Sequence, residues 1–577
     1  MTLRFKSKAI SPNNKSIYLI CFILLLNFLF FIYYFISPVP FGDDLPTIYE
    51  FLLKLHNSSS LSEKIQLMIS NNFVEHKLLF FTILVSILYG ITGKISLPLF
   101  ALSAGLAWTS IFFFYQRWIK SFPRIWLLSI TFVLVSLASY QAIFWTMAGL
   151  QHLGVTFMCF LTIYLLCKVE KLSVYSFLPA VVAGMICTFS SGNGMAIWPA
   201  GFLALLLLKN YKALMGWVVS SALGIGLYLS HVTLKETPSG SKISGIFDNL
   251  PTKILNIITG LAGATYFDYS SLDLSDSEPV ISFFYPAIYI GLFIIICFIL
   301  VLLKAYQRTD RDAIAVVSVS LFMFITFAFI TIGRSSEGIF VIFKSRYYPY
   351  SIIALANMLF CVAYLTYNNR NKHIFAYVFL VFSSLLWGVC QFSSYINLLN
   401  QRNLLSTGYI NFMVNKNWII YQPSAFYENY YNTFFNQEKA PLVTLPKYDI
   451  LTAFQNKKIT NQGFHKCLLV RSNNSFNNPF ISVHVYNGEA PGIFKKDEGY
   501  AIVMASEMDT IFLPTQLLRN SLKQLLLTGK VTRKGYVVNT PLRKGSFPEG
   551  TYQLHQFYFN NQEGRLNPQS EGTIHFQ

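Results

Sequence analysis

The stretch SIYLICFILLLNFLFFIYYFISPVPFGDD, residues 16–44, decides the class of fold. Its apolar run, 17–37, has the length of about 20 residues that a helix needs to cross a bilayer. No small-x-small cleavage site follows the run, so we expect a retained first span rather than a secretory signal. Two adjacent carboxylates, Asp43 and Asp44, come directly after it. Charge is costly to desolvate at a bilayer edge, and acids found there usually have a function.

The rest of the chain has the composition of a polytopic membrane protein. It is 54% hydrophobic and 12% charged, whereas soluble domains carry roughly 25% charged residues. The sequence therefore predicts an α-helical membrane domain over 1–395, with about eleven spans of roughly 20 residues. After the first span, the predicted spans are 97–115, 125–145, 152–167, 175–191, 194–208, 213–232, 283–304, 313–332, 348–367 and 374–394.

The charge of the loops predicts the orientation. Lys and Arg collect before residue 17 and in alternate loops, as the positive-inside rule requires of the cytoplasmic side. We therefore expect a multi-pass protein of the inner (cytoplasmic) membrane with a cytoplasmic N-terminus. The alternation holds only when 78–92 does not cross, so this run is predicted to be an interfacial or re-entrant helix. The outer loops are then 38–76, 233–282 and 333–347.

The net charge of +18 is explained by this topology. No basic helix or zinc pattern indicates a nucleic-acid partner. Within the outer loop 233–282, the segment 246–262 is apolar enough to lie along the membrane surface, in contact with membrane lipids.

The composition changes after residue 395. Residues 396–577 are polar and contain no run long enough to span a membrane, and 400–460 is predicted to be helical or irregular. From about residue 465, short alternating runs separated by Gly and Pro turns are typical of strands. We therefore predict an extracytoplasmic soluble domain of α+β or β-rich type. The strand candidates are 467–470, 481–485, 500–504 and 536–538.

Two clusters near the start of the chain could carry chemistry. Asp43 and Asp44 either cap the helix that follows or supply a general base, for which Asp44, nearer that helix, is slightly favoured. The second cluster is Glu75, His76 and Lys77. It either opens an amphipathic helix with polar residues or binds a phosphate or a sugar at the water boundary.

Two further clusters lie on the predicted outer face. The loop 333–347 is basic although it is outside, through Arg334, Lys344 and Arg346. A phosphate ligand would explain these cations, and the alternative is contact with lipid headgroups by snorkelling. The aromatic and polar side chains at two other outer turns belong either to the interfacial aromatic belt or to a sugar site. The substrate-binding candidates among them are Trp145, Gln151 and Asn193.

No Walker loop, dinucleotide fingerprint, zinc-protease motif or hydrolase elbow is present in the sequence. The order of the remaining motifs resembles the GT-C superfamily of integral-membrane glycosyltransferases over about residues 1–395. The matching motifs are Phe41-Gly42-Asp43-Asp44, Glu75-His76-Lys77-Leu78-Leu79 and Ser345-Arg346-Tyr347. Lys77 stands where this family would have Arg, which keeps the charge but loses the bidentate fork. The domain after residue 395 matches no family known to us.

This resemblance implies a polyprenyl-phosphate-linked sugar as donor and transfer on the outer face of the membrane, as in bacterial transferases that modify cell-surface polysaccharide or O-antigen of lipopolysaccharide. The predicted function is an inverting glycosyltransferase whose acceptor is a cell-envelope glycan or a lipid-linked saccharide. A flippase or transporter of lipid-linked saccharide and a membrane polysaccharide polymerase are the alternatives. No cofactor is certain, and two adjacent acids would also accommodate a divalent metal. The roles expected are base for Asp44 or Asp43, donor phosphate binding for Arg346, Arg334, Lys344, Tyr347 and Lys77, and substrate binding for Glu75, His76, Trp145, Gln151 and Asn193.

Overall fold

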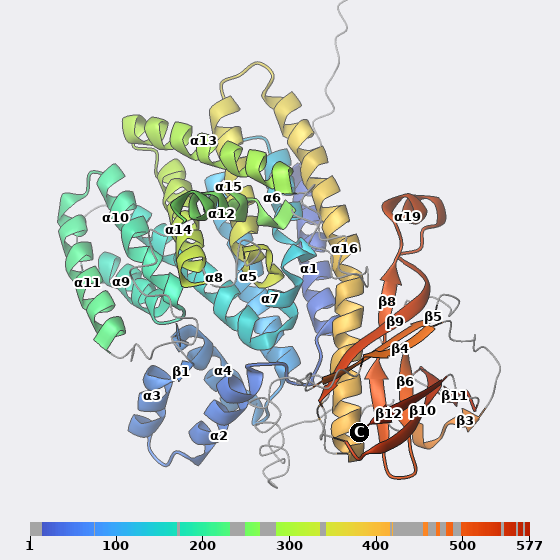
Figure 1. Ribbon diagram of the computed structural model, residues 1–577. Coiled ribbons are helices and arrows are strands. Elements are labelled where there is room, and N and C mark those ends of the chain that lie inside the picture. The colour runs from blue at the N-terminus through green and yellow to red at the C-terminus, as the bar shows by residue number, and fades with distance from the viewer. Residues whose placement is uncertain are drawn as a thin grey trace, which may run out of the picture.

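A bundle of apolar helices and a β-domain lie beside each other and are joined by one long helix, α16 (Figure 1). The β-domain comprises strands β3–β12 and the short helix α19. The computed structural model describes residues 14–73, 76–169, 174–230, 249–265, 284–334, 342–415, 418, 454–459, 469–473, 480–487, 498–543, 547–560, 563–568 and 572–576.

The helices of the bundle follow the apolar runs of the sequence. They are α1 Asn14–Phe35, α5 Leu97–Trp118, α6 Ile125–Leu134, α7 Tyr140–Phe144, α8 Thr146–Lys168, α9 Val174–Thr188, α10 Ile197–Leu207, α11 Tyr211–Ser230, α12 Leu250–Leu261, α13 Phe284–Arg308, α14 Arg311–Gly333, α15 Tyr348–Thr366 and α16 Lys372–Asn415. Shorter elements join them: η1 Leu45–Tyr49, α2 Glu50–Asn57, α3 Leu61–Ser70, β1 Asn72–Phe73, β2 His76–Lys77, α4 Leu79–Thr92, η2 Leu137–Ser139, η3 Gly192–Ala196, η5 Gly263–Thr265 and η9 Ser345–Tyr347.

Within the described residues, nine helical segments are long and apolar enough to cross a membrane. The chain is accordingly a multi-pass membrane protein, because a backbone in lipid must satisfy its own hydrogen bonds and helices do so. Eleven spans were predicted, but two of the corresponding helices are too short to count among these nine. The runs 175–191 and 194–208 form α9 and α10, which have 15 and 11 residues, fewer than the roughly 17 that a span needs.

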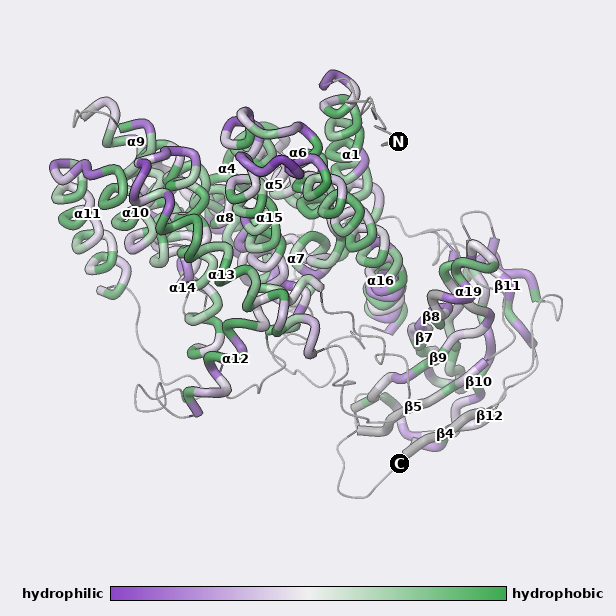
Figure 2. The backbone as a smooth tube through the Cα atoms, turned by 90° about the horizontal axis from the view of Figure 1, so that it is seen from above, coloured by the Kyte–Doolittle hydropathy of each residue, from purple (hydrophilic) through white to green (hydrophobic). Residues whose placement is uncertain are grey.

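Figure 2 shows that most of the bundle consists of hydrophobic residues, and many of them lie on its outside. Large side chains such as Phe22, Phe113 and Leu303 are more than half exposed. Contiguous apolar surface of this extent is rare on soluble monomers, and lipid is the solvent that suits it. The core of the bundle is also apolar, with Trp108, Trp126 and Trp217 among its fully buried side chains.

Helix α4 corresponds to the apolar run 78–92. It has 14 residues and ends at Gly93, whose φ of +66° closes the helix. This length is short for a perpendicular span. Its side chains contact α2 and α3: Thr82 Oγ1 donates to the carbonyl of Met68, and the Tyr89 hydroxyl bonds His56 Nδ1. The side of the membrane on which α4 lies stays a prediction from loop charge.

The domain boundary predicted at residue 395 falls inside a continuous helix. Helix α16 runs for 44 residues, from Lys372 to Asn415. Its second half remains helical because it is a packing surface, with Ile396, Leu399 and Leu405 buried. The composition changes within α16, and the helix continues beyond that point to carry the β-domain.

The β-domain confirms the expectation of a strand-rich region near the C-terminus. Most of the predicted strand residues fall in strands, although 467–468 lie outside the described residues. The elements are β3 Lys458–Ile459, β4 Leu469–Asn473, β5 Phe480–Asn487, β6 Gly499–Ala505, β7 Thr510–Pro514, β8 Gln516–Arg519, α19 Leu522–Thr528, β9 Thr532–Arg543, β10 Gly550–Phe559, β11 Gly564–Leu566 and β12 Gly572–Phe576.

Two sheets pack face to face in this domain. One has the order β3-β11-β10-β6-β7, with β12 pairing to β10, and the other has the order β4-β5-β9-β8. The rings of Tyr500 and Tyr536 stack between the sheets, with centroids 5.2 Å apart. The opposite face of the first sheet packs on α16, where Ile410 joins Val503 and Phe512 in a small apolar cluster. The layers are therefore helix, sheet and sheet.

Asparagine side chains of α16 bind the strands that run beside it. Asn411 Nδ2 donates to the carbonyl of Phe512 at 2.6 Å, and Phe512 N donates to Asn411 Oδ1 at 2.7 Å. Asn403 Nδ2 donates to the Thr515 carbonyl at 2.7 Å, and Leu517 N donates to Asn400 Oδ1 at 2.8 Å. Since β7 ends one path of its sheet, α16 covers an edge that would otherwise present unpaired backbone groups.

Asn411→Ala is expected to loosen the β-domain from α16. The change removes both bonds to Phe512 and leaves a buried N–H and a buried carbonyl unpaired, at a cost of roughly 2–4 kcal/mol. Thermal unfolding in detergent and limited proteolysis would measure the loss. Gln401→Ala on the same helix is the matched control, since Gln401 bonds none of the described residues. Equal unfolding temperatures for the two variants would contradict this account of the docking.

Candidate active site

Asp44 joins the loop after α1 to the start of α8. Its Oδ1 accepts a hydrogen bond from Met147 N at 2.8 Å, and its Oδ2 accepts one from Phe41 N at 2.9 Å. The first N–H groups of a helix have no partner within it, and the helix dipole favours a negative charge there. Asp44 therefore caps α8, a helix 103 positions along the chain. The alternative that it caps the helix that follows it is wrong, because it makes no side-chain bond to η1.

This cap explains where α8 begins. The predicted span started at residue 152, whereas α8 starts at Thr146, six positions earlier. The added turn contains Met147, and the carboxylate of Asp44 binds its N–H group. Local sequence could not show this partner because it comes from the loop after the first span.

Burial raises the pKa of Asp44 to about 7. Desolvation is the main cause, the N–H groups of Phe41 and Met147 oppose it, and the charge of neighbouring Asp43 adds to it. The side chain is 1% exposed. Because both carboxylate oxygens are occupied by backbone donors, Asp44 is enclosed as a structural group rather than open to a substrate hydroxyl.

Asp43 is the more accessible of the two acids, since its side chain is only partly buried. Its carbonyl accepts bonds from Thr47 N at 3.1 Å and Thr47 Oγ1 at 2.6 Å, so two hydrogen bonds from Thr47 stabilise the turn. Gly42 permits the turn: its φ is +52°, and a Cβ there would lie 3.1 Å from the ring of Trp145. The rings of Phe41 and Trp145 meet edge to face at 5.3 Å.

The second turn of α8 carries the next polar contacts. Gln151 Nε2 donates to Ser191 Oγ at 3.1 Å, and His152 Nδ1 bonds the Tyr350 hydroxyl at 2.8 Å. Asn193, from η3, contacts the same tyrosine, and its Nδ2 lies 3.5 Å from Thr326 Oγ1 of α14. Two outer turns that are separate in the sequence thus meet here, because Tyr350 contacts both His152 of α8 and Asn193 of η3.

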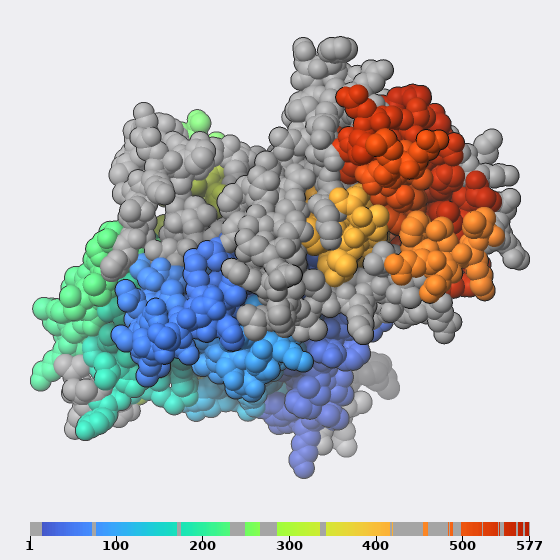
Figure 3. Space-filling model, turned by 90° about the horizontal axis from the view of Figure 1, so that it is seen from below, coloured from blue at the N-terminus to red at the C-terminus, as the bar shows by residue number. Residues whose placement is uncertain are grey.

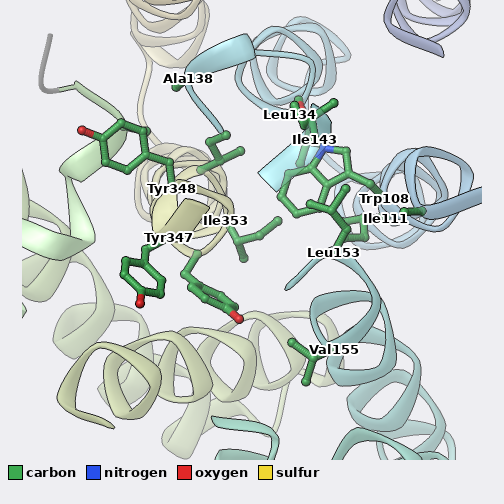
Figure 4. Close-up of a cluster of buried hydrophobic side chains, with 14 of the residues drawn as sticks. Trp108, Ile111, Leu134, Ala138, Ile143, Leu153, Val155, Tyr347, Tyr348 and Ile353 are labelled. Carbon is green, nitrogen blue, oxygen red and sulfur yellow. Dashed lines mark hydrogen bonds between the residues drawn. The ribbon is translucent and has the colours of Figure 1, made fainter. Parts of the chain in front are cut away.

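Arg346 and Tyr347 lie in η9, beside this polar group. Ser345 Oγ donates to the Ala138 carbonyl at 2.5 Å and accepts from Gln141 N at 3.3 Å, which fixes η9 against α7. The rings of Tyr347 and His152 are 5.8 Å apart. Figure 4 shows the apolar cluster that contains Tyr347, with residues of α8 such as Leu153. The guanidinium of Arg346 lies 5.1 Å from the Tyr347 ring centre, and its Nε is enclosed without a hydrogen bond to any described residue.

Lys77, in β2, lies beside the end of α9. Leu79 N donates to the Phe189 carbonyl at 2.8 Å and Phe80 N donates to Ser190 Oγ at 3.1 Å, so the chain after Lys77 is pinned to the end of α9. Lys77 is 2% exposed, its Nζ lies 5.3 Å from the Phe189 ring centre, and desolvation lowers its pKa. Ser191, the partner of Gln151, is two positions beyond Phe189.

For the other predicted site residues the structure describes fewer contacts. Arg334 follows the end of α14 and is partly buried, and Lys344 precedes η9 and is exposed. The part of their loop that contains Glu337 lies outside the described residues, as does Glu75. His76 is described by its backbone alone, paired with Phe73.

The sequence interpretation missed the polar face of α12, in the segment 246–262 predicted to lie along the membrane. Lys253 and Asn256 are buried, while Leu250 and Ile254 are nearly half exposed. The helix therefore turns its polar face to the protein and its apolar face outward. Asn256 Oδ1 is enclosed without a partner in the described residues. The spacing of Lys253, Asn256 and Gly260 on one helical face was the available signal.

Both oxygens of Asp44 accept backbone N–H groups, and the part of the chain that is described contains no group of three or more His, Cys, Asp or Glu side chains that could hold an ion. No model of a known protein family, no curated protein and no solved structure matches the chain.

Proposed function

We propose that this protein is an inverting glycosyltransferase that moves a sugar from a polyprenyl-phosphate-linked donor to a cell-surface glycan or lipid-linked acceptor. One observation carries the proposal: elements far apart in the sequence bring Asp44 and the ring of Tyr347, the residue after Arg346, to the first two turns of α8. These turns lie at the edge of the spans, since Asp44 reaches them from the short loop after α1. A lipid-linked donor cannot leave the bilayer, so its transferase needs a site at that edge.

The accessible carboxylate of Asp43 suits the role of general base. In the proposed step the acceptor hydroxyl gives its proton to Asp43 while its oxygen forms a bond to the anomeric carbon of the donor sugar. The bond between that carbon and the phosphate oxygen breaks on the opposite face, and the configuration inverts. Asp44 is a positioning residue here, because its bonds to Phe41 and Met147 hold the turn that presents Asp43.

The departing polyprenyl phosphate needs positive charge beside it. Arg346 suits this role because its Nε has no hydrogen bond within the described residues, and a guanidinium fork can bind two phosphate oxygens. Preorganised donors of this kind stabilise charge that develops in the transition state. Lys77 would add a second cation from the side of Ser191. By the charge of the loops, the reaction takes place on the extracytoplasmic face.

Arg346→Ala is expected to weaken use of the lipid-phosphate donor while acceptor binding is kept. Loss of a charged hydrogen bond costs on the order of 1.5–3 kcal/mol, which is a rise of about 10- to 150-fold in the donor KM, and Arg346→Lys should recover only part of it. Purified protein in proteoliposomes, titrated with donor and then with acceptor, gives both constants, and binding of polyprenyl phosphate alone gives an independent measure.

The matched control for this experiment is Lys94→Ala, which removes an exposed cation outside the candidate site. Its donor KM should equal that of the unchanged protein. An unchanged donor KM and unchanged polyprenyl phosphate binding in Arg346→Ala would show that Arg346 contacts headgroups only. Translocation of the donor without a new glycosidic bond would favour the flippase instead.

A further inference from the structure

The turn that carries α19 has the character of a membrane-binding segment. Residues 521–534 read SLKQLLLTGKVTRK, in which three consecutive leucines are flanked by lysines. Ser521 caps the helix, and Gly529, with a φ of +67°, ends it. Leu526 is 79% exposed and Leu527 is 70% exposed. Two neighbouring leucines so exposed at the tip of a turn are unusual for a surface in water.

The chain that leads to α19 runs along α16 toward the membrane. Strands β7 and β8 run antiparallel to α16, so successive strand residues bond α16 residues with decreasing numbers. The pairs are Thr510 with Asn415, Phe512 with Asn411, Thr515 with Asn403, Leu517 with Asn400, and Arg519 with Asn397 and Ser393. From Asn415 to Ser393 the helix covers about 33 Å, at 1.5 Å per residue. Arg519 is therefore already beside the last turn of the apolar run 374–394.

Helix α19 comes directly after Arg519. Continuing in the same direction leads it past Ser393, toward the part of α16 with large exposed apolar side chains, such as Leu385, which is 64% exposed. Figure 1 shows α19 at the height of the spans and above the sheets of the β-domain. Figure 2, viewed from above, shows α19 beyond α16 and outside the helical bundle. A segment at the depth of the spans but outside the bundle faces the bilayer.

We propose that α19 inserts into the leaflet on the side of the membrane that carries the β-domain. Leu526 and Leu527 would enter the boundary between headgroups and acyl chains, to a depth of roughly 5–10 Å as for interfacial helices. Lys523 and Lys530 would reach anionic headgroups by snorkelling. The β-domain would then have two attachments, α16 and α19, and would be held against the membrane. The inference does not depend on the proposed transferase activity.

The shape of the molecule agrees with this placement. Figure 3 shows the end face from below, where the segment of α2 and α3 (blue) and the β-domain (orange to red) both occur. The Met508 turn between β6 and β7 lies at the Asn415 end of α16, away from the spans. The segment β7–β8 thus has different surroundings at its two ends. The Met508 turn before β7, although Met508 is 79% exposed, lies toward water, and α19 after β8 lies toward the membrane.

A polarity-sensitive nitrobenzoxadiazole label tests the inference. It is attached to Leu526→Cys or to the control Met508→Cys in a Cys467→Ser background, because every other cysteine of the chain is buried. The full-length protein is reconstituted in vesicles of phosphatidylethanolamine and phosphatidylglycerol. At 526 we expect blue-shifted emission and loss of most of it when lipids carry doxyl groups. At 508 we expect aqueous emission and no quenching.

A second variant checks that the leucines cause the insertion. Leu527→Asp, added to the Leu526→Cys protein, should shift the emission back toward that of the aqueous label and remove most of the quenching. Aqueous, unquenched emission at 526 in the parent protein would overturn the proposal. Blue-shifted emission at 526 without quenching by doxyl lipids would also overturn it, since the label would then lie in a protein contact.

Discussion

Replacing Asp43 by asparagine should abolish sugar transfer and leave the protein folded. Asparagine keeps the size of the side chain but cannot take the acceptor proton, and loss of a general base costs about 10²- to 10⁴-fold in rate. The turn should persist, because Thr47 binds the carbonyl of Asp43 rather than its carboxylate. The turnover number in proteoliposomes at saturating donor and acceptor is the measurement.

Glu50→Gln is the matched control for loss of an acid near the same turn. Glu50 forms an ion pair with Lys54 at the surface of α2, and exposed pairs contribute little, so its turnover number should stay at the unchanged level. Wild-type turnover in Asp43→Asn would remove Asp43 from the mechanism. A folded but inactive Asp44→Asn beside an active Asp43→Asn would move the base to Asp44, which the sequence alone favoured.

The stability of the protein should fall as the pH rises toward 7, through the titration of Asp44. Its pKa is raised to about 7 in the folded protein, mainly by burial, and is about 3.9 in an unfolded chain. Between these values the folded state holds a proton that the unfolded state has released, so the stabilisation present below about pH 4 is lost by about pH 7. Lowering the pH from 8 to 5 should therefore raise the free energy of unfolding by roughly 3 kcal/mol.

Thermal unfolding in detergent at pH 5 and pH 8 measures this difference. Asp44→Asn cannot titrate and should lose this component of the pH dependence. Asp43→Asn is the matched comparison: it should keep the component, displaced to slightly lower pH, because the charge of Asp43 helps to raise the pKa of Asp44. The assignment fails when Asp44→Asn and the unchanged protein show the same difference between the two pH values.

These two experiments separate the roles of neighbouring acids. Asp44 has both oxygens bound by backbone donors and is enclosed, so its replacement acts on the joint between the α1 loop and α8. Asp43 lies in the same turn but is only partly buried, so under the proposed mechanism its replacement is expected to lower the rate. A variant whose transfer rate falls while its unfolding temperature stays unchanged has lost a group of the kind proposed for Asp43.

The sequence by itself determined the membrane class, most of the spans and the strand-rich region. Each of these depends on local pattern. A run of about 20 apolar residues forms a helix in lipid because no water is present to satisfy its backbone. The strand 481–485 was predictable because its polar and apolar residues alternate, as side chains on opposite faces of a sheet do, and 500–504 was predictable as a short apolar run. The candidate site residues were also visible as residue types, since acids and cations beside apolar runs are conspicuous.

Only the tertiary structure decided how those residues are used. Asp44 caps α8 through a partner 103 positions away, α16 continues past residue 395 because the strands β7 and β8 cover it, and α12 turns its polar face inward. Gln151 binds Ser191, and Asn193 contacts Tyr350 of α15. Each of these is a contact between distant segments, and its energy depends on which groups packing leaves buried and without water, which no local pattern contains.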